Sequence, residues 1–177
     1  MLHRLVSLLA ACALCLAIRL CPETSKWPPG LVQSNMWGGT GGTLFNDLCE
    51  ISASPKLESI TLKGEERLDS VSLTTSGKTF THGGQGGKTS FLKLDKGEHI
   101  TSIELCWKER NGADRIYYMR ATTDGKQIKS VEAGMRTKHC EMIPTKKEET
   151  RKYALVGLQG RAGKEIDKLG FYMVPIH

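Results

Sequence analysis

Two glycine clusters and one aspartate are the residues of this chain whose types and spacing could do chemistry. The clusters are GGTGG at 38–42 and GGQGG at 83–87, and Asp167 ends a Gly-x-x-x-Asp motif that begins at Gly163. Glycines let backbone N–H groups approach a ligand closely, because no Cβ is in the way. A carboxylate beside such amides presents acceptors and donors together, as the vicinal hydroxyls of a sugar require. The aspartate could instead cap its own turn, and spacing alone leaves that alternative open.

The elements that must position these residues are β-strands. No stretch shows sustained 3.6-residue periodicity of apolar positions, whereas several short runs alternate apolar and polar residues between turn signals. Asn111-Gly112 is a strong hairpin dipeptide, and Asp124-Gly125 is another. The predicted strands are 57–63, 68–75, 90–94, 99–107, 114–123, 127–132, 153–159 and 166–176. This regular spacing predicts an all-β sandwich, barrel or prism.

A weak internal repeat indicates that the domain contains three similar β units. The glycine clusters begin at Gly38 and Gly83, and each leads into a β-type run. A second similarity pairs residues 64–73 with residues 163–172, so that Asp69 corresponds to Asp167. A repeat of this length predicts three β units in which the third glycine loop has degenerated.

Length and composition predict one domain preceded by a processed segment. The chain has 177 residues, of which 39% are hydrophobic and 25% charged, and this composition excludes wholesale disorder. Residues 1–17 form a predicted signal peptide, because a basic start precedes an apolar run too short to cross a membrane. Residues 18–36 are predicted to be an extended leader and residues 37–177 the domain. We therefore expect a secreted, extracellular protein.

The cysteine pattern agrees with secretion. Cys12 and Cys15 lie in the apolar run, which leaves four cysteines: Cys21, Cys49, Cys106 and Cys140. Four cysteines permit two disulfides in three pairings, and none of them has the spacing of metal ligands. We predict Cys106–Cys140, because Cys106 ends one predicted strand and Cys140 follows the next two. Cys21–Cys49 is then the other predicted pair.

The same motifs resemble the jacalin-related lectins. GGTGG followed by TLFND, THGGQGG and above all GLQGRAGKEIDKLGFY carry the resemblance, which extends from residue 37 to about residue 175. The resemblance implies an all-β fold, the β-prism I of three four-stranded antiparallel Greek-key units with pseudo-threefold symmetry. It also implies a carbohydrate-binding protein that does not catalyse a reaction.

The resemblance further implies a sugar site. One sugar would bind the backbone amides of Gly42, Lys164 and Glu165, while the Asp167 carboxylate accepts hydrogen bonds from two hydroxyls. The chain reads continuously through the glycine loop without a processing signal, so it resembles the uncleaved, mannose/glucose-preferring branch of the family. The matching loop at 64–69 is one residue too long, and we do not expect a working second site.

Other functions are weaker alternatives. Residues 126–152 hold eight Lys or Arg and four Glu, so they could bind sulfated or other polyanionic glycans, although we favour a solvated mixed face. The strongest alternative is a secreted interaction module whose sugar site does not function. His82, His99 and His139 could serve a nucleophile, but no motif places them beside one, and we expect no enzyme activity, cofactor or metal. We expect no nucleic-acid partner, and the avidity that a shallow sugar site requires is compatible with a homodimer.

Overall fold

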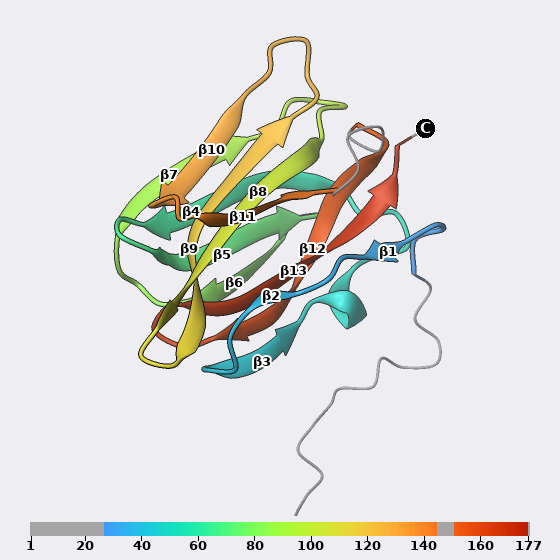
Figure 1. The fold of residues 1–177 in the computed structure, drawn as a ribbon. Coiled ribbons are helices and arrows are strands. Elements are labelled where there is room, and N and C mark those ends of the chain that lie inside the picture. The colour runs from blue at the N-terminus through green and yellow to red at the C-terminus, as the bar shows by residue number, and fades with distance from the viewer. Residues whose placement is uncertain (1–26, 145–150, 177) are drawn as a thin grey trace, which may run out of the picture.

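The computed structural model describes residues 27–144 and 151–176, and the predicted signal peptide, residues 1–17, lies outside this part. The described chain consists of thirteen β-strands and one 3-10 helix, Leu48–Glu50, in three antiparallel sheets (Figure 1). No helix in the described part is long and apolar enough to span a membrane.

The strands divide among the sheets by unit. One sheet has the order β6-β5-β4-β7, with β4 at Leu57–Gly64, β5 at Leu68–Thr75, β6 at Lys78–Gly83 and β7 at Lys88–Lys93. A second has the order β10-β9-β8-β11, with β8 at Ile100–Arg110, β9 at Ala113–Thr123, β10 at Ser130–Gly134 and β11 at His139–Ile143. The third has the order β1-β13-β12-β3, with β2 also paired to β13. Its strands are β1 at Val32–Gln33, β2 at Trp37–Gly38, β3 at Thr43–Asn46, β12 at Tyr153–Ala162 and β13 at Ile166–Pro175.

The sheets share one topology, which confirms the predicted all-β class and the three antiparallel units. In the first two sheets, three consecutive strands pair as hairpins and the fourth returns beside the first, which is a Greek key. The third sheet has the same arrangement, but it joins the two ends of the chain. Its blue N-terminal strands lie beside the red β13 in Figure 1.

The predicted leader, residues 18–36, contributes to this closure. Val32 of β1 pairs with Met173 of β13, and the backbone N–H of Phe171 donates to the Ser34 hydroxyl at 2.9 Å. The end of the leader is therefore part of a sheet.

Turn chemistry explains which predicted hairpins form. Asn111 and Gly112 both have positive φ, 54° and 79°, and join β8 to β9 directly, as the dipeptide predicts. Asp124-Gly125 does not make a two-residue hairpin, and β10 starts at Ser130, later than the predicted 127. The Asp124 carboxylate instead accepts a hydrogen bond from the His99 backbone N–H at 2.8 Å, which ties the end of β9 to the start of β8.

Four strands lack a usable sequence pattern. β1, β2, β6 and β11 were not predicted, because they are short or lie at an edge of a sheet, where half-exposed and exposed side chains do not alternate clearly. β3 was predicted only as a β-type run after the first glycine cluster, without bounds. β6, for example, has no fully buried residue.

One core fills the space between the three sheets. Fully buried apolar side chains enter it from every sheet, among them Leu62, Leu73, Ile103, Met119, Leu155 and Phe171. Burying each such side chain stabilises the fold by about 1.5–3 kcal/mol before the cost of ordering it. The core therefore fixes the sheets relative to one another, and with them the loops at their ends.

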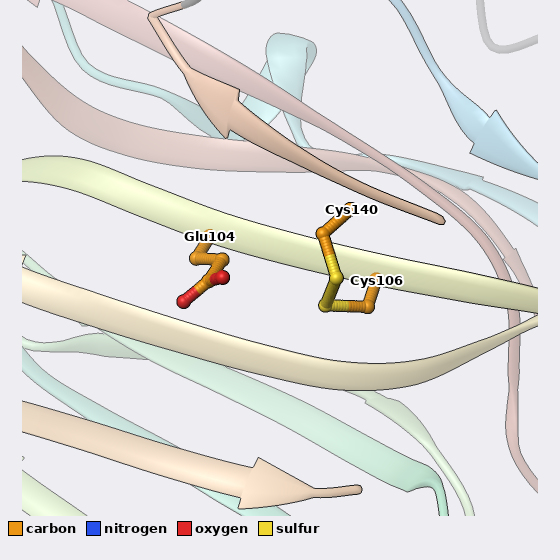
Figure 2. A group of neighbouring side chains, drawn as sticks. All are labelled: Glu104, Cys106 and Cys140. Atoms are coloured by element: carbon orange, nitrogen blue, oxygen red, sulfur yellow. A yellow bond between two sulfur atoms is a disulfide. The ribbon is translucent and has the colours of Figure 1, made fainter. Parts of the chain in front are cut away.

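The predicted Cys106–Cys140 disulfide is present and joins β8 to β11 at directly paired positions (Figure 2). Glu104 lies beside it, and these three residues form a cluster of potential metal ligands. Both sulfur atoms are bonded to each other, so neither is a thiolate that could ligate a metal, and Glu104 forms an ion pair with Arg136. The predicted Cys21–Cys49 pair includes Cys21, which lies outside the described residues.

Candidate functional site

Asp167 lies against the glycine loop that connects β2 to β3. The aspartate is only 4% exposed. A Cβ added to Gly41 would lie 2.4 Å from its Oδ1, and a Cβ added to Gly42 would lie 2.5 Å from its Oδ2. Only glycine therefore fits beside this carboxylate, and the positive φ of Gly42, 63°, has the same requirement. The structure thus brings together two of the predicted site residues, Gly42 and Asp167.

The other two predicted residues form the tip of the β12–β13 loop. The Gly163 backbone N–H donates to the carbonyl of Glu165 at 3.0 Å, which tightens the turn. Lys164 is exposed. Its carbonyl oxygen packs against Gly84, where an added Cβ would lie only 2.2 Å from it. The roles of the Lys164 and Glu165 amides stay predictions. The side chain of Glu165 forms an ion pair with Arg115.

Two arginines that the sequence analysis did not single out hold the site in place. Arg115 of β9 places its Nε 3.0 Å from Asp167 Oδ1 and 3.0 Å from Glu165 Oε1. Arg161 donates to the carbonyls of Gly41 and Gly42 at 2.8 and 2.9 Å and so fixes the glycine loop. Arg161 lies in the GLQGRAG motif and could have been considered. Arg115 comes from another unit, and no local pattern connects it to Asp167.

Burial controls the charge of the site. Desolvation raises the pKa of Asp167 above its ordinary value of 3.8; the positive charge of Arg115 opposes this shift, and the negative charge of Glu165 adds to it. The carboxylate is accordingly harder to ionise than a surface aspartate, and each proton that it binds removes a hydrogen-bond acceptor.

Backbone contacts define the equivalent positions in the three units. Gly39 N–H donates to the carbonyl of Asp167 at 2.8 Å, and Gly84 N–H donates to that of Asp69 at 2.9 Å. In the remaining unit, the sheet of β8 to β11, the N–H of Met135 donates to the carbonyl of Tyr117 at 3.0 Å. Asp167, Asp69 and Tyr117 are therefore equivalent, which agrees with the predicted repeat of Asp69 and Asp167 and identifies the third position.

Asp69 reproduces part of the arrangement around Asp167. It is 7% exposed, and a Cβ on Gly87 would lie 2.7 Å from its Oδ2. Arg67 lies 3.3 Å from Asp69 Oδ1 and also pairs with Glu165. The two aspartates are thus joined by alternating charges through Arg67, Glu165 and Arg115. Desolvation raises the pKa of Asp69 as well.

Two of the three histidines considered as catalytic candidates, His82 and His99, pair with carboxylates. His82 Nε2 lies 2.8 Å from Asp47 Oδ1, and the His82 ring stacks on Phe45 with centroids 3.7 Å apart. His99 Nδ1 lies 3.2 Å from Asp124 Oδ2. Among the described residues, the hydrogen bonds of both rings run to these carboxylates and none runs to a serine or cysteine.

The glycine loop, the buried aspartate and the three Greek-key sheets agree with a known family. The model of the Jacalin-like lectin domain matches residues 34–172. This chain belongs to the jacalin-like lectins. The match confirms the resemblance inferred from the motifs, and the fold is the β-prism of this family.

Solved structures show the same fold at low sequence identity. Malaysian banana lectin is 24% identical to the present protein with a TM-score of 0.66. The match covers 83% of the present protein and 100% of the banana lectin chain. A mannose binding jacalin related lectin from Ananas comosus is 23% identical with a TM-score of 0.67, over 83% and 99% of the two chains. A mannose-specific jacalin-related lectin from Morus nigra, solved with mannose, is 22% identical with a TM-score of 0.66, over 82% and 95%.

Proposed function

We propose that this protein is a secreted lectin that binds mannose- or glucose-type glycans at Asp167 and does not catalyse a reaction. The observation that carries the proposal is the contact between the Asp167 carboxylate and the Gly41-Gly42 loop, where added Cβ atoms would lie 2.4 and 2.5 Å from its oxygens. A buried carboxylate beside a glycine loop, whose N–H groups a ligand can approach closely, suits two adjacent hydroxyls, each of which both donates and accepts.

The choice of sugar rests on two further points. The Ananas comosus and Morus nigra lectins are described as mannose binding and mannose-specific. This chain continues without interruption through Gly41, Gly42 and Thr43, as in the family branch that prefers mannose and glucose. The amides of Lys164 and Glu165 would complete the site by donating to the same sugar.

The competing hypothesis is an interaction module whose sugar site is inactive. Arg115 gives it a structural basis, because this arginine already occupies Asp167 Oδ1 at 3.0 Å. A glycan array with free mannose as competitor separates the two functions. The lectin should bind mannose-containing glycans and release them when mannose is added. Absence of glycan binding by the folded protein would favour the interaction module.

Secretion and self-association remain parts of the proposal. The Cys106–Cys140 disulfide suits an oxidising compartment such as the extracellular space. A homodimer would present two sugar sites at once and raise avidity.

Cations of the basic segment 126–152 lie at both ends of β10 in the described part of the chain. Lys126 lies between β9 and β10, before the first residue of β10, whereas Arg136 and Lys138 follow its last residue. Residues 145–150, which include Lys146 and Lys147, lie outside the described part.

Acidification should weaken mannose binding at a higher pH than an exposed aspartate would require. The site needs the ionised carboxylate, and burial raises the pKa of Asp167 above 3.8, so protonation begins earlier as the pH falls. A carboxyl group with a raised pKa in the folded state favours folding as it takes up a proton, so this group does not cause acid unfolding. Mannose titrations at decreasing pH, in an Asp69→Asn background with folding followed by circular dichroism, test this expectation. Constant affinity down to about pH 4 would contradict it.

A further inference from the structure

The unit of strands β8 to β11 carries a groove where the other two units carry an aspartate. The residues that line it are Glu66, Lys108, Arg110, Tyr117, Met135, Arg136, Thr137, Lys138 and His139, and its volume is about 680 Å³. Tyr117 takes the position of Asp167 and Asp69, as the equivalent backbone contacts show. The carboxylate that is proposed to accept two hydrogen bonds from a neutral sugar is therefore absent from this position.

The glycine loop has changed as well. Gly134 keeps the positive φ and the close approach to a carbonyl that Gly38 and Gly83 have in the other units. The four residues after Gly134 are Met135, Arg136, Thr137 and Lys138, in place of Gly-x-Gly-Gly. Met135, Thr137 and Lys138 thus replace the three glycines, and Arg136 stands at the variable position. The β8 strand adds Lys108 and Arg110, whose two-residue spacing places them on one side of the strand.

These charges are incompletely balanced. Four cationic side chains line the groove against one carboxylate, Glu66. Arg136 pairs with Glu104, but no ion pair is found for Lys108, Arg110 or Lys138 within the described residues. Lys108 lies over the Tyr117 ring, with its Nζ 5.9 Å from the ring centroid. Exposed cations around an aromatic ring can bind the anionic group of a ring-shaped ligand by charge, while the aromatic ring stacks against the ligand's ring.

The groove lies at the same end of the prism as the two aspartates. Each glycine loop touches a hairpin of the next unit: Gly39 approaches Asp114, Gly84 approaches Lys164, and Gly134 approaches the Gly64–Arg67 turn. These three contacts form a closed ring, so a saccharide chain that reaches the Asp167 site is close to the groove. This proximity favours a saccharide over a lipid headgroup as the bearer of the anion.

We propose that the groove between Lys108, Arg110, Tyr117 and Lys138 binds the sulfate groups of a sulfated saccharide. The disulfide holds it in shape, because Cys106 and Cys140 lie two residues from Lys108 and Lys138. The Thr137 hydroxyl donates to the carbonyl of Trp107 at 2.7 Å and fixes the loop to β8. This binding does not require the Asp167 site to function.

Heparin is the probe for this proposal. The lectin should be retained on immobilised heparin at low ionic strength and released as salt screens the charges. The double variant Lys108→Gln/Lys138→Gln should bind heparin at least about tenfold more weakly, because charge-assisted hydrogen bonds to sulfate are lost. Neither lysine has an ion pair in the described structure, so the fold should survive.

A matched control carries the same loss of charge elsewhere in the basic segment. Lys126→Gln/Lys152→Gln should change heparin affinity by less than about twofold, because both exposed residues lie outside the groove. Glu66→Gln, which removes the one carboxylate of the lining, should tighten heparin binding about twofold or more. Asp167→Asn should leave heparin binding unchanged, which separates this proposal from mannose binding.

Three results would overturn the proposal. Equal losses in the two lysine double variants would mean that heparin senses the overall charge of the surface. Equal retention on fully desulfated heparin would mean that sulfate is not recognised. Binding to vesicles that contain anionic phospholipid, without binding to heparin, would assign the groove to a lipid headgroup.

Discussion

Asp167→Ala is expected to reduce mannose affinity at least tenfold. If the wild type binds the monosaccharide with millimolar affinity, binding by the variant would be too weak to detect. The carboxylate would accept hydrogen bonds from two adjacent hydroxyls, and hydrogen bonds to a charged group are worth about 1.5–3 kcal/mol each. The carboxylate is buried against Gly41 and Gly42, neither of which has a side chain that could take its place. Isothermal titration with mannose measures the effect.

The shape of the site provides a second variant. Asp167→Asn keeps the side-chain volume but replaces one acceptor by a donor, so it should also fail to bind mannose. This variant matters because Asp167→Ala leaves Arg115 without one of its two carboxylate partners. Thermal unfolding should show that both proteins are folded before their affinities are compared.

Two further variants serve as controls. Lys164→Ala should cost little, because the proposed contact is made by the backbone and the side chain is exposed. Asp69→Ala should leave mannose binding near that of the wild type, because the Gly64–Asp69 loop is one residue longer than the Gly163–Asp167 loop. If Asp69→Ala abolished binding and Asp167→Ala did not, the site would lie on the other unit. Normal binding by folded Asp167→Ala would refute the proposed site altogether.

Removal of the Cys106–Cys140 disulfide is expected to lower the free energy of unfolding by about 3–4 kcal/mol. The two cysteines are separated by 34 residues, so the cross-link removes a large part of the conformational freedom of the unfolded chain. A typical domain is stable by about 5–15 kcal/mol, so this loss is a substantial fraction of the total. Urea unfolding of Cys106→Ala/Cys140→Ala, compared with the wild type under non-reducing conditions, measures it.

The location of the disulfide predicts which function suffers. It joins β8 to β11 within their own sheet, whereas Asp167 and its glycine loop belong to the sheet of β13. At temperatures where the double variant is folded, mannose binding should therefore be retained. A loss of stability below about 1 kcal/mol would mean that the strand pairing alone holds this unit together.

The sequence by itself determined the local parts of this protein. Alternating runs predicted most of the central strands, because side chains that alternate between core and solvent leave a two-residue period in the chain. Asn111-Gly112 predicted its hairpin, since the two positive φ values of the turn suit these residues. The two glycine clusters and the GLQGRAGKEIDKLGFY stretch carried the resemblance to the family, and the resemblance implied that Gly42 and Asp167 share one site.

Only the tertiary structure decided what depends on contacts between distant segments. The strands β6 and β11 lie at sheet edges and their side chains are mostly exposed or half-exposed, so no alternating pattern of apolar residues predicts them. Arg115 reaches Asp167 from another unit. The basic groove is formed by residues of β8, β9 and the β10–β11 loop. Electrostatic contacts require only proximity in space, and the core that packs the three sheets together sets that proximity. No spacing along the chain encodes this proximity, so the basic groove could be found only from the folded structure.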